Sequence, residues 1–220
     1  MIRERMGRTL IGALVAAGAC VVVALGAYGN GSTGQSDTPP KHAFDAVGAL
    51  PLAERVLRTG ELGGMVPTSS PTVTVGAMAW AAGEGLQPDG IENEAARLRS
   101  LGFSEGVAEN LKTRGNSDRF GLSLVERFSS PAAARAELAH AARPGGGWTY
   151  FAVPGIPGAR GFEARGARYG GRNVAFTAGG FYYLVGAGWS RPSAADQIAR
   201  GGVIAAAQLL YGRVHGHAIL

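Results

Sequence analysis

The sequence has few of the residues on which disulfide-bonded folds and many hydrolytic sites depend. Its only cysteine is Cys20, so the chain beyond it can form no internal disulfide, and a small disulfide-stapled fold is excluded. Four histidines are present, and none falls in a predicted core or cleft. They lie in a linker (His42), on a helix face expected to be exposed (His140), and near the C-terminus (His215 and His217).

Recognisable catalytic motifs are also scarce. The chain has no H-E-x-x-H sequence and no phosphate-binding G-x-x-x-x-G-K-[ST] sequence. A nucleophile, a base and an orienting group within hydrogen-bond reach cannot be assembled from its pattern. We therefore expect no catalytic residue, no metal site and no cofactor, and the sequence favours a protein that is not an enzyme.

The first 28 residues have the pattern of a membrane segment. An uncharged run, LIGALVAAGACVVVALGAY, covers residues 10–28 and is 19 residues long, close to the ~20 that a helix needs to cross the hydrocarbon core of a bilayer. Three arginines and one glutamate precede it, so the positive-inside bias keeps residues 1–9 in the cytoplasm. We expect residues 10–28 to form a single-pass transmembrane helix in the cell membrane, with everything after them outside the cytoplasm.

Two other fates of this segment stay open. Small residues at 24–29 would allow a signal peptidase to cleave, which would give a secreted protein. Cys20 could carry a lipid, although the AGAC sequence lacks the leucine typical of a lipoprotein signal. Residues 29–43 are rich in Gly, Ser, Thr and Pro and predict a flexible linker. Residues 44–220 are long enough for one domain with its own core.

The charge balance is mild once the N-terminus is set aside. Beyond residue 28 the chain has 18 basic and 15 acidic residues, an excess too small to indicate nucleic acid as a partner. Only two of the basic residues are lysines, Lys41 and Lys112. Abundant Arg, Ala and Gly together are typical of a GC-rich genome, so high glycine alone does not indicate a function.

Periodicity predicts an α+β domain. Helical spacing or capping appears at 51–63, 89–101, 129–142 and 190–214, with Asp89–Glu92 and Ser193–Asp196 as expected capping pairs. Alternation appears at 103–112, 119–128 and 148–153, and in two strands within 173–188 that meet at Gly179-Gly180. The expected order is α-α-β-β-α-β-β-β-α, an antiparallel sheet of about five strands packed against helices.

The same patterns predict which faces are buried. In 119–128 we expect one solvated face and one core face, and in the last helix a stripe of small residues against the sheet. The expected solvated residues are Arg119, Ser123, Arg127, Glu105 and Glu109; the expected core residues are Phe120, Leu122, Leu124 and Phe128 in the strand and Ile198, Gly202, Ala205 and Leu209 in the helix.

The stretch 153–173, VPGIPGARGFEARGARYGGRN, is the candidate binding segment. It is rich in glycine and has four arginines but one acidic residue, and ten of the chain's 17 aromatic residues lie between positions 148 and 189. A string of turns explains the glycines, whereas arginines beside aromatic rings can form a surface for an anion or a polymer. The candidate ligand-binding residues are Arg160, Arg165, Arg168, Arg172 and Trp189.

Several segments, among them AERVLRTGELGG, FSSPAAARAEL, VPGIPGARGF and NVAFTAGGFYYLVGAG, resemble uncharacterised exported or lipid-anchored domains of high-GC bacteria. The layout is similar to that of Mog1/PsbP-like sandwiches, mostly non-catalytic binding domains, and that comparison is an analogy of fold. The resemblance names no activity and supplies no functional residue.

Together these features predict a membrane-tethered, extracytoplasmic, non-catalytic binding domain. An anionic lipid, a cell-envelope polymer or a partner protein is the expected ligand. An exported hydrolase with an unrecognised site is one alternative. The other is an assembly factor of a membrane complex that acts through its transmembrane helix, since Gly12 and Ala16 have the small-xxx-small spacing of helix packing.

Overall fold

The computed structural model describes residues 50–84, 86–143, 148–165, 170–191 and 199–216. The expected membrane segment at 10–28 and the linker at 29–43 lie outside these ranges, as do Ser193 and Arg168. Within the ranges, no helix combines the length and the apolar character needed to cross a bilayer.

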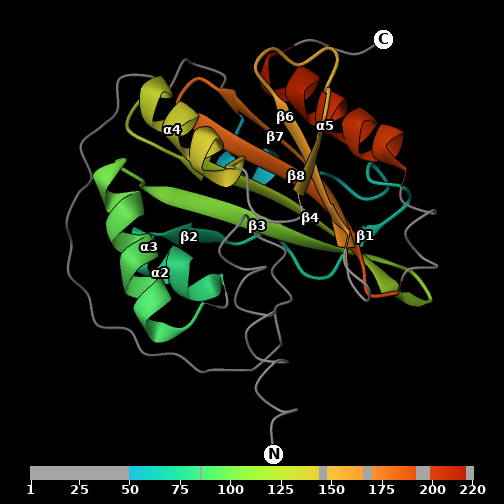
Figure 1. Cartoon of the computed structure of the whole chain (residues 1–220), viewed down its shortest axis with the longest axis horizontal. Coiled ribbons are helices and arrows are strands. Elements are labelled where there is room, and N and C mark those ends of the chain that lie inside the picture. The colour runs from blue at the N-terminus through green and yellow to red at the C-terminus, as the bar shows by residue number, and fades with distance from the viewer. Residues whose placement is uncertain (1–49, 85, 144–147, 166–169, 192–198, 217–220) are drawn as a thin grey trace, which may run out of the picture.

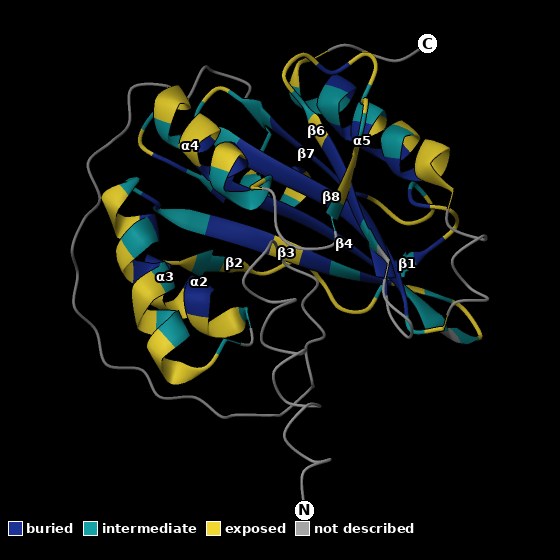
Figure 2. Ribbon diagram, in the orientation of Figure 1, coloured by how far each residue is buried: buried dark blue, intermediate teal, exposed yellow. Residues whose placement is uncertain are grey.

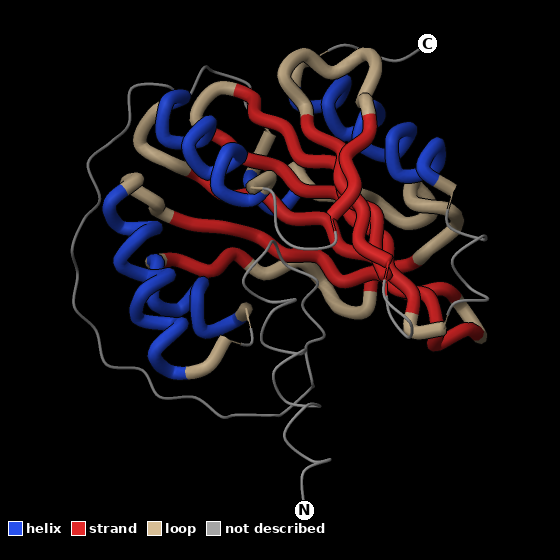
Figure 3. The backbone as a smooth tube through the Cα atoms, viewed as in Figure 1, coloured by secondary structure: helices blue, strands red, loops and turns tan. Residues whose placement is uncertain are grey.

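The described part of the chain is an α+β fold built on one antiparallel sheet of eight strands (Figures 1 and 3). The order across the sheet is β1-β3-β4-β8-β7-β6-β5, and β2 also pairs with β3 at the β1 side. The strands are β1 Val66–Pro67, β2 Val73–Val75, β3 Glu105–Thr113, β4 Asn116–Arg127, β5 Trp148–Phe151, β6 Arg160–Arg165, β7 Gly170–Ala178 and β8 Phe181–Trp189.

Helices cover both faces of this sheet. On one face, α2 (Ala77–Gly83) and α3 (Pro88–Ser100) lie over the β2–β3 side, and α4 (Pro131–Ala141) packs on β7 and β8. On the other face, α5 (Arg200–Val214) packs on β7 and β8 beside the short 3-10 helix η1 (Leu52–Glu54). The sheet therefore separates two hydrophobic cores.

The central strands are buried on both faces (Figure 2). Val125 and Val185 belong to the core under α5, whereas Leu124 and Leu184 belong to the core under α2, α3 and α4. The expectation of one solvated face on 119–128 was thus wrong, although Leu122 and Leu124 are core residues as expected. Ser123 is fully buried, and its Oγ accepts a hydrogen bond of 3.0 Å from the backbone N–H of Leu57, which satisfies the hydroxyl there.

The strand count was too low because β6 does not look like a strand in sequence. Its six residues include two arginines, a glutamate and a glycine, which read as part of a turn string. Pairing with both β5 and β7 supplies the backbone hydrogen bonds, and the inward Glu163 is neutralised by arginines from elsewhere in the chain. Two short strands, β1 and β2, were also missed.

Several helix boundaries differ from the prediction. Only η1 is helical in 51–63, so the expected helix is much shorter than predicted, although Gly60 and Gly63, its expected stop residues, do have positive φ. The expected Asp89–Glu92 capping pair does not form, because α3 begins at Pro88 after Gln87 with no side-chain cap. The cap expected at 129–130 is confirmed: Ser130 Oγ accepts a hydrogen bond from Ala133 N–H.

The inner face of α5 lies one position away from the predicted stripe. Ala205 and Leu209 are exposed, and the residues buried against the sheet are Val203, Ala206, Ala207 and Leu210. A run of small and aliphatic residues gives almost no amphipathic signal, so periodicity alone could not orient this helix.

The β7–β8 hairpin turns at Gly179-Gly180 as predicted. Gly179 has a φ of 59°, in the left-handed region that favours glycine, but Gly180 does not have a positive φ as expected. The carbonyl of Gly180 accepts a hydrogen bond of 2.8 Å from Phe128 N–H. This bond holds the hairpin turn against the segment that leads from β4 into α4.

Candidate functional site

The structure does not bring the predicted arginine surface together. Arg160 is exposed on β6, whereas Arg172 and Trp189 are buried, with the Arg172 guanidinium 5.1 Å from the Trp189 ring centroid. Nothing is described for the side chain of Arg165 or for Arg168. Two of the five predicted residues therefore face each other inside the fold, and binding by the others stays a prediction.

Arg172 has a structural partner in Glu163. Its Nε donates a hydrogen bond of 3.0 Å to Glu163 Oε2, and Arg200 of α5 donates two more bonds to the same carboxylate. Hydrogen bonds from Arg200, together with those from Arg172, lower the pKa of Glu163 to about 2. These three residues tie α5 to β6 and β7, so Arg172 stabilises the fold.

A basic pocket lies at another place, where the β7–β8 turn meets the start of α4 and the end of α5. Its volume is about 320 Å³. Two arginines are among its lining residues, and none of the described residues that line it is acidic. The lining residues are Arg55, Arg127, Phe128, Ser129, Ser130, Pro131, Ala178, Gly179, Gly180, Phe181, Val214 and His215.

Arg55 is fixed in this pocket by contacts from two directions. Its Nε donates to the carbonyl of Leu50 at 2.8 Å, and its Nη1 donates to the Tyr183 hydroxyl at 2.9 Å. The guanidinium carbon lies 4.3 Å from the centroid of the Phe181 ring, a cation–π contact. Nη2 of Arg55 makes no hydrogen bond with any described residue, so this nitrogen has donors for a ligand.

Arg127 approaches the same aromatic ring. Its guanidinium carbon lies 5.8 Å from the Phe181 centroid, and its Nη1 pairs with Glu105 Oε1 at 3.1 Å. The pairing of Glu105 with an arginine across the β3–β4 hairpin is confirmed. Two guanidinium groups thus lie near the Phe181 ring, and the Glu105 carboxylate offsets part of the Arg127 charge.

The N-terminus of α4 opens beside the arginines. The first N–H groups of a helix lack intrahelical partners and carry the positive end of the helix dipole. Ser130 Oγ satisfies Ala133 N–H, and Pro131 has no N–H to satisfy. The first turn of α4 contains no acidic residue, so the Ala132 N–H adds a donor to a region that is already positive.

The pocket can therefore hold one anionic group against an apolar surface. Carboxylate and phosphate oxygens match the donor geometry of guanidinium groups, and the rings and aliphatic groups of Phe181, Ala178 and Val214 would contact an apolar part of the ligand. Sequence reasoning missed this pocket because Arg55, Arg127 and Phe181 lie far apart in the chain. No local motif signals it.

One spacing in the chain does match a catalytic motif, contrary to the expectation that none is present. Residues 102–106, Gly-Phe-Ser-Glu-Gly, match the G-x-S-x-G pattern of hydrolase nucleophiles. Ser104 lies at the start of an antiparallel strand, and its Oγ is 3.3 Å from the Arg127 carbonyl. The motif's strand–turn–helix context is therefore missing, and no described histidine bonds to this hydroxyl.

Glu109 does not share the solvated face expected for it. It is 2% exposed on β3, and its Oε1 has no hydrogen-bond partner among the described residues. Burial raises the pKa of this carboxyl. His140 is half-buried rather than exposed, and burial together with the Arg97 charge lowers its pKa. Within the described ranges, no group of three or more His, Cys, Asp or Glu side chains is arranged to hold a metal ion.

No protein-family model and no curated protein sequence matches the chain. Among solved structures, the chain is similar to the extracellular domain of PknH from Mycobacterium tuberculosis. The identity is 14% and the TM-score 0.49, and the match covers 77% of this chain and 99% of that one. A likeness at this level assigns neither a family nor a function, and the resemblance to Mog1/PsbP-like sandwiches stays a prediction.

Proposed function

We propose that this chain is a membrane-tethered, extracytoplasmic binding domain that holds an anionic group of its ligand in the basic pocket at the β7–β8 turn. One observation carries the proposal: the guanidinium groups of Arg55 and Arg127 lie near the Phe181 ring at the edge of a pocket whose described lining has no acidic residue.

Electrostatics favour an anion here over a neutral ligand. Arg55 is 8% exposed, so its charge is screened less by water and salt than that of a surface arginine. Tyr183 and the Leu50 carbonyl orient this guanidinium but carry no negative charge. An incoming carboxylate or phosphate would supply the counter-charge and bond to the unused nitrogen.

The proposed location rests on the N-terminal sequence. The charge pattern ahead of residues 10–28 supports a location of the domain outside the cytoplasm. Anionic lipid head groups and anionic envelope polymers both present phosphate or carboxylate groups there. The shared chemistry is an anionic oxygen group next to an apolar or neutral portion of the ligand.

The test uses the full chain in nanodiscs of zwitterionic phosphatidylcholine. Glycerol 3-phosphate stands in for a polymer unit, and dihexanoyl phosphatidylglycerol stands in for a lipid. Arg55→Gln with Arg127→Gln should weaken binding at least about tenfold, because charge-assisted hydrogen bonds contribute ~1.5–3 kcal/mol each. Raising the salt concentration should weaken binding by the wild type, since screening acts over ~8–10 Å.

The matched control makes the same change in charge at exposed positions. Arg58→Gln with Arg160→Gln removes two arginines outside the pocket and should leave affinity within about twofold, because exposed charges contribute little. Arg55→Lys keeps the charge and checks folding. Loss of binding in the control pair, with the pocket pair unaffected, would contradict the proposal.

A separate variant tests the surface predicted from the sequence. Arg160→Gln, Arg165→Gln and Arg168→Gln together leave the buried Arg172 in place, so the fold keeps its ion pair with Glu163. If this triple variant loses binding and the pocket pair does not, the anion contacts the arginine-rich segment 160–168 and not the basic pocket.

A further inference from the structure

A second pocket, of about 220 Å³, lies on the opposite face of the sheet between β2, α2 and the strands β3 and β4. Its floor is apolar, with Ala108, Leu122 and Leu124, and Trp80 and Glu84 of the α2 segment also line it. Hydroxyl and amide groups form much of the remaining wall: Ser69, Ser70, Thr72, Thr74 and Asn110.

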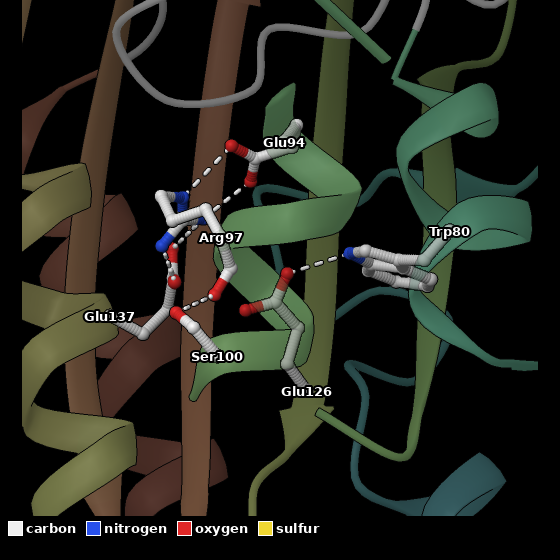
Figure 4. A network of polar contacts seen from close by, with 6 residues as sticks. All are labelled: Trp80, Glu94, Arg97, Ser100, Glu126 and Glu137. Atoms are coloured by element: carbon white, nitrogen blue, oxygen red, sulfur yellow. Dashed lines mark hydrogen bonds and ion pairs between the residues drawn. The ribbon is translucent and has the colours of Figure 1, made fainter. Parts of the chain in front are cut away.

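Trp80 links this pocket to a group of acidic side chains. A Cβ at position 106 would lie 2.7 Å from the Trp80 ring, so only glycine lets the indole lie this close to β3. The indole Nε1–H donates a hydrogen bond of 2.7 Å to Glu126 Oε1 (Figure 4). Glu126 is 4% exposed, and its other oxygen, Oε2, has no hydrogen-bond partner among the described residues.

Acidic residues outnumber basic ones around this site. Figure 4 shows Arg97 of α3 between Glu94 and Glu137, and its guanidinium bonds to both carboxylates. Those two carboxylates occupy the nearest arginine. Within the described residues, neither Glu84 nor Glu126 forms an ion pair with a basic side chain.

Burial first, and then the neighbouring carboxylates, raise the pKa values of the acidic groups at this site. Burial, with the charges of Glu94 and Glu137, raises the pKa of Glu84 to about 8. Burial is also the main reason that the pKa values of Glu126, Glu137 and Tyr182 are raised. On α4, burial and the Arg97 charge lower the pKa of His140. A positively charged group of a ligand, placed next to Glu84, would therefore offset negative charge at this site.

We infer that this second pocket binds a small ligand through a primary ammonium group, with Glu84 as its carboxylate partner and the hydroxyl-lined wall around its polar part. An ammonium group donates three hydrogen bonds, and the pocket offers carboxylate, amide and hydroxyl acceptors. Binding near neutral pH breaks the O–H bond of protonated Glu84; its proton passes to solvent, and the carboxylate pairs with the ammonium group.

An organic ammonium group fits this site better than a metal ion. No described set of three or more ligating side chains is arranged for a metal, and the floor of the pocket would contact carbon atoms. The inference stands apart from the proposed anion site, because the two pockets share no lining residue.

The test uses the full chain in phosphatidylcholine nanodiscs, with n-butylamine as the probe and n-butanol as its uncharged counterpart. The NMR signal of the Trp80 indole N–H reports binding, since that group bonds to Glu126. The amine should bind and the alcohol should not. Because binding releases one proton from a carboxyl whose pKa is about 8, affinity should rise about tenfold per pH unit between pH 6 and 7.5.

Two variants remove the site in different ways. Glu84→Gln keeps the shape but removes the charge, and it should abolish both the binding and its pH dependence. Ala108→Phe fills the pocket from an exposed strand position without a change in charge, and it should also block the amine. Glu92→Gln, exposed on α3, is the matched control and should bind as the wild type does.

Each result decides the inference. Equal binding of n-butanol and n-butylamine would overturn it, as would absence of amine binding at pH 8. Unchanged amine binding by folded Glu84→Gln would also overturn it. Loss of amine binding in the Arg55→Gln and Arg127→Gln variant would show that the amine binds in the basic pocket, and this result would also overturn the inference.

Discussion

Three glutamates with nearly equal burial differ because their partners differ. Glu163, Glu126 and Glu137 are 4–5% exposed. Glu163 receives hydrogen bonds from two arginines, which lower its pKa to about 2. Glu126 receives a bond from a neutral indole, and burial raises its pKa well above the usual range. Two arginine partners thus lower the pKa of Glu163, whereas burial outweighs one arginine at Glu137 and a neutral indole at Glu126, whose pKa values are raised.

Glu163 gives the clearest test of how arginine partners stabilise a buried carboxylate. Glu163→Gln would leave the buried Arg172 without its carboxylate, and we expect a loss of about 3–5 kcal/mol in the free energy of unfolding. Urea denaturation measures it. Glu126→Gln is the matched control: Gln can accept the indole hydrogen bond, and we expect a loss below about 1 kcal/mol. Similar losses in both variants would refute this assignment of charge states.

Sequence reasoning at single residues succeeded where neighbours in the chain decide the environment. The cap at Ser130 and the Glu105–Arg127 pair were predictable because a helix start and a hairpin bring those partners together locally. The burial of Arg172 depends on Glu163 and Arg200, which belong to other elements. Nothing local distinguishes such an arginine from a ligand-binding one.

At the scale of elements, strands with alternating apolar residues were located well and β6 was not. The strands β3 and β4 and the β7–β8 hairpin lie where alternation and turn residues placed them. The charged residues of β6 are tolerated only because the sheet and α5 bring arginines to Glu163. Tertiary pairing overrides local composition in such a segment.

The orientation of α5 gives a prediction at this scale. Leu210 is fully buried, whereas its neighbour Leu209 is 39% exposed. Leu210→Ala should lower the free energy of unfolding by about 2–5 kcal/mol, as loss of a buried leucine does. Leu209→Ala should change it by less than about 1 kcal/mol. Thermal or urea unfolding of the two variants measures both values, and the reverse ranking would restore the stripe predicted from the sequence.

At the scale of the whole molecule, stability should depend on pH in two separate windows. Glu84 has a raised pKa of about 8 in the folded protein, so its stabilising contribution is present below the ordinary value near 4.5 and is lost as the pH rises toward 8. The raised pKa values of Glu126 and Glu137 act in the same direction. Glu163 acts oppositely, and its contribution is lost as the pH falls from about 4.5 toward 2.

We therefore expect the melting temperature to be higher at pH 5 than at pH 8 and to fall again below pH 4. Differential scanning calorimetry in buffers of constant ionic strength measures this profile. Glu84→Gln should flatten the loss between pH 5 and 8 and leave the acid limb unchanged. A wild-type melting temperature that rises from pH 5 to pH 8 would contradict the raised pKa values of Glu84, Glu126 and Glu137.

The membrane topology is a further property of the whole chain. The arginines before residues 10–28 predict that the domain lies outside the cytoplasm. A reporter that is active only outside the cytoplasm, fused after Leu220, should be active, and fractionation should leave the full-length chain in the membrane. Activity from a cytoplasm-only reporter would reverse the topology, and a soluble form that begins near Gly29 would indicate a cleaved signal.

The sequence predicted the class of fold and the antiparallel sheet because these follow from repeated local patterns. It did not predict either pocket. Arg55, Arg127 and Phe181 meet only through the pairing of β4 with β8 and the packing of the segment before β1. The arginine-rich segment at 153–173 drew attention because its arginines are close in sequence, which is a different property from closeness in space.

The most direct test of the basic pocket is to map where an anion binds. Amide NMR shifts of the full chain in phosphatidylcholine nanodiscs should be recorded during titration with glycerol 3-phosphate. We predict that the largest shifts occur at 129–133, where the α4 N-terminus has an unused N–H, and at 179–181 in the β7–β8 turn. Largest shifts at 160–165, with 129–133 and 179–181 unmoved, would contradict the proposal.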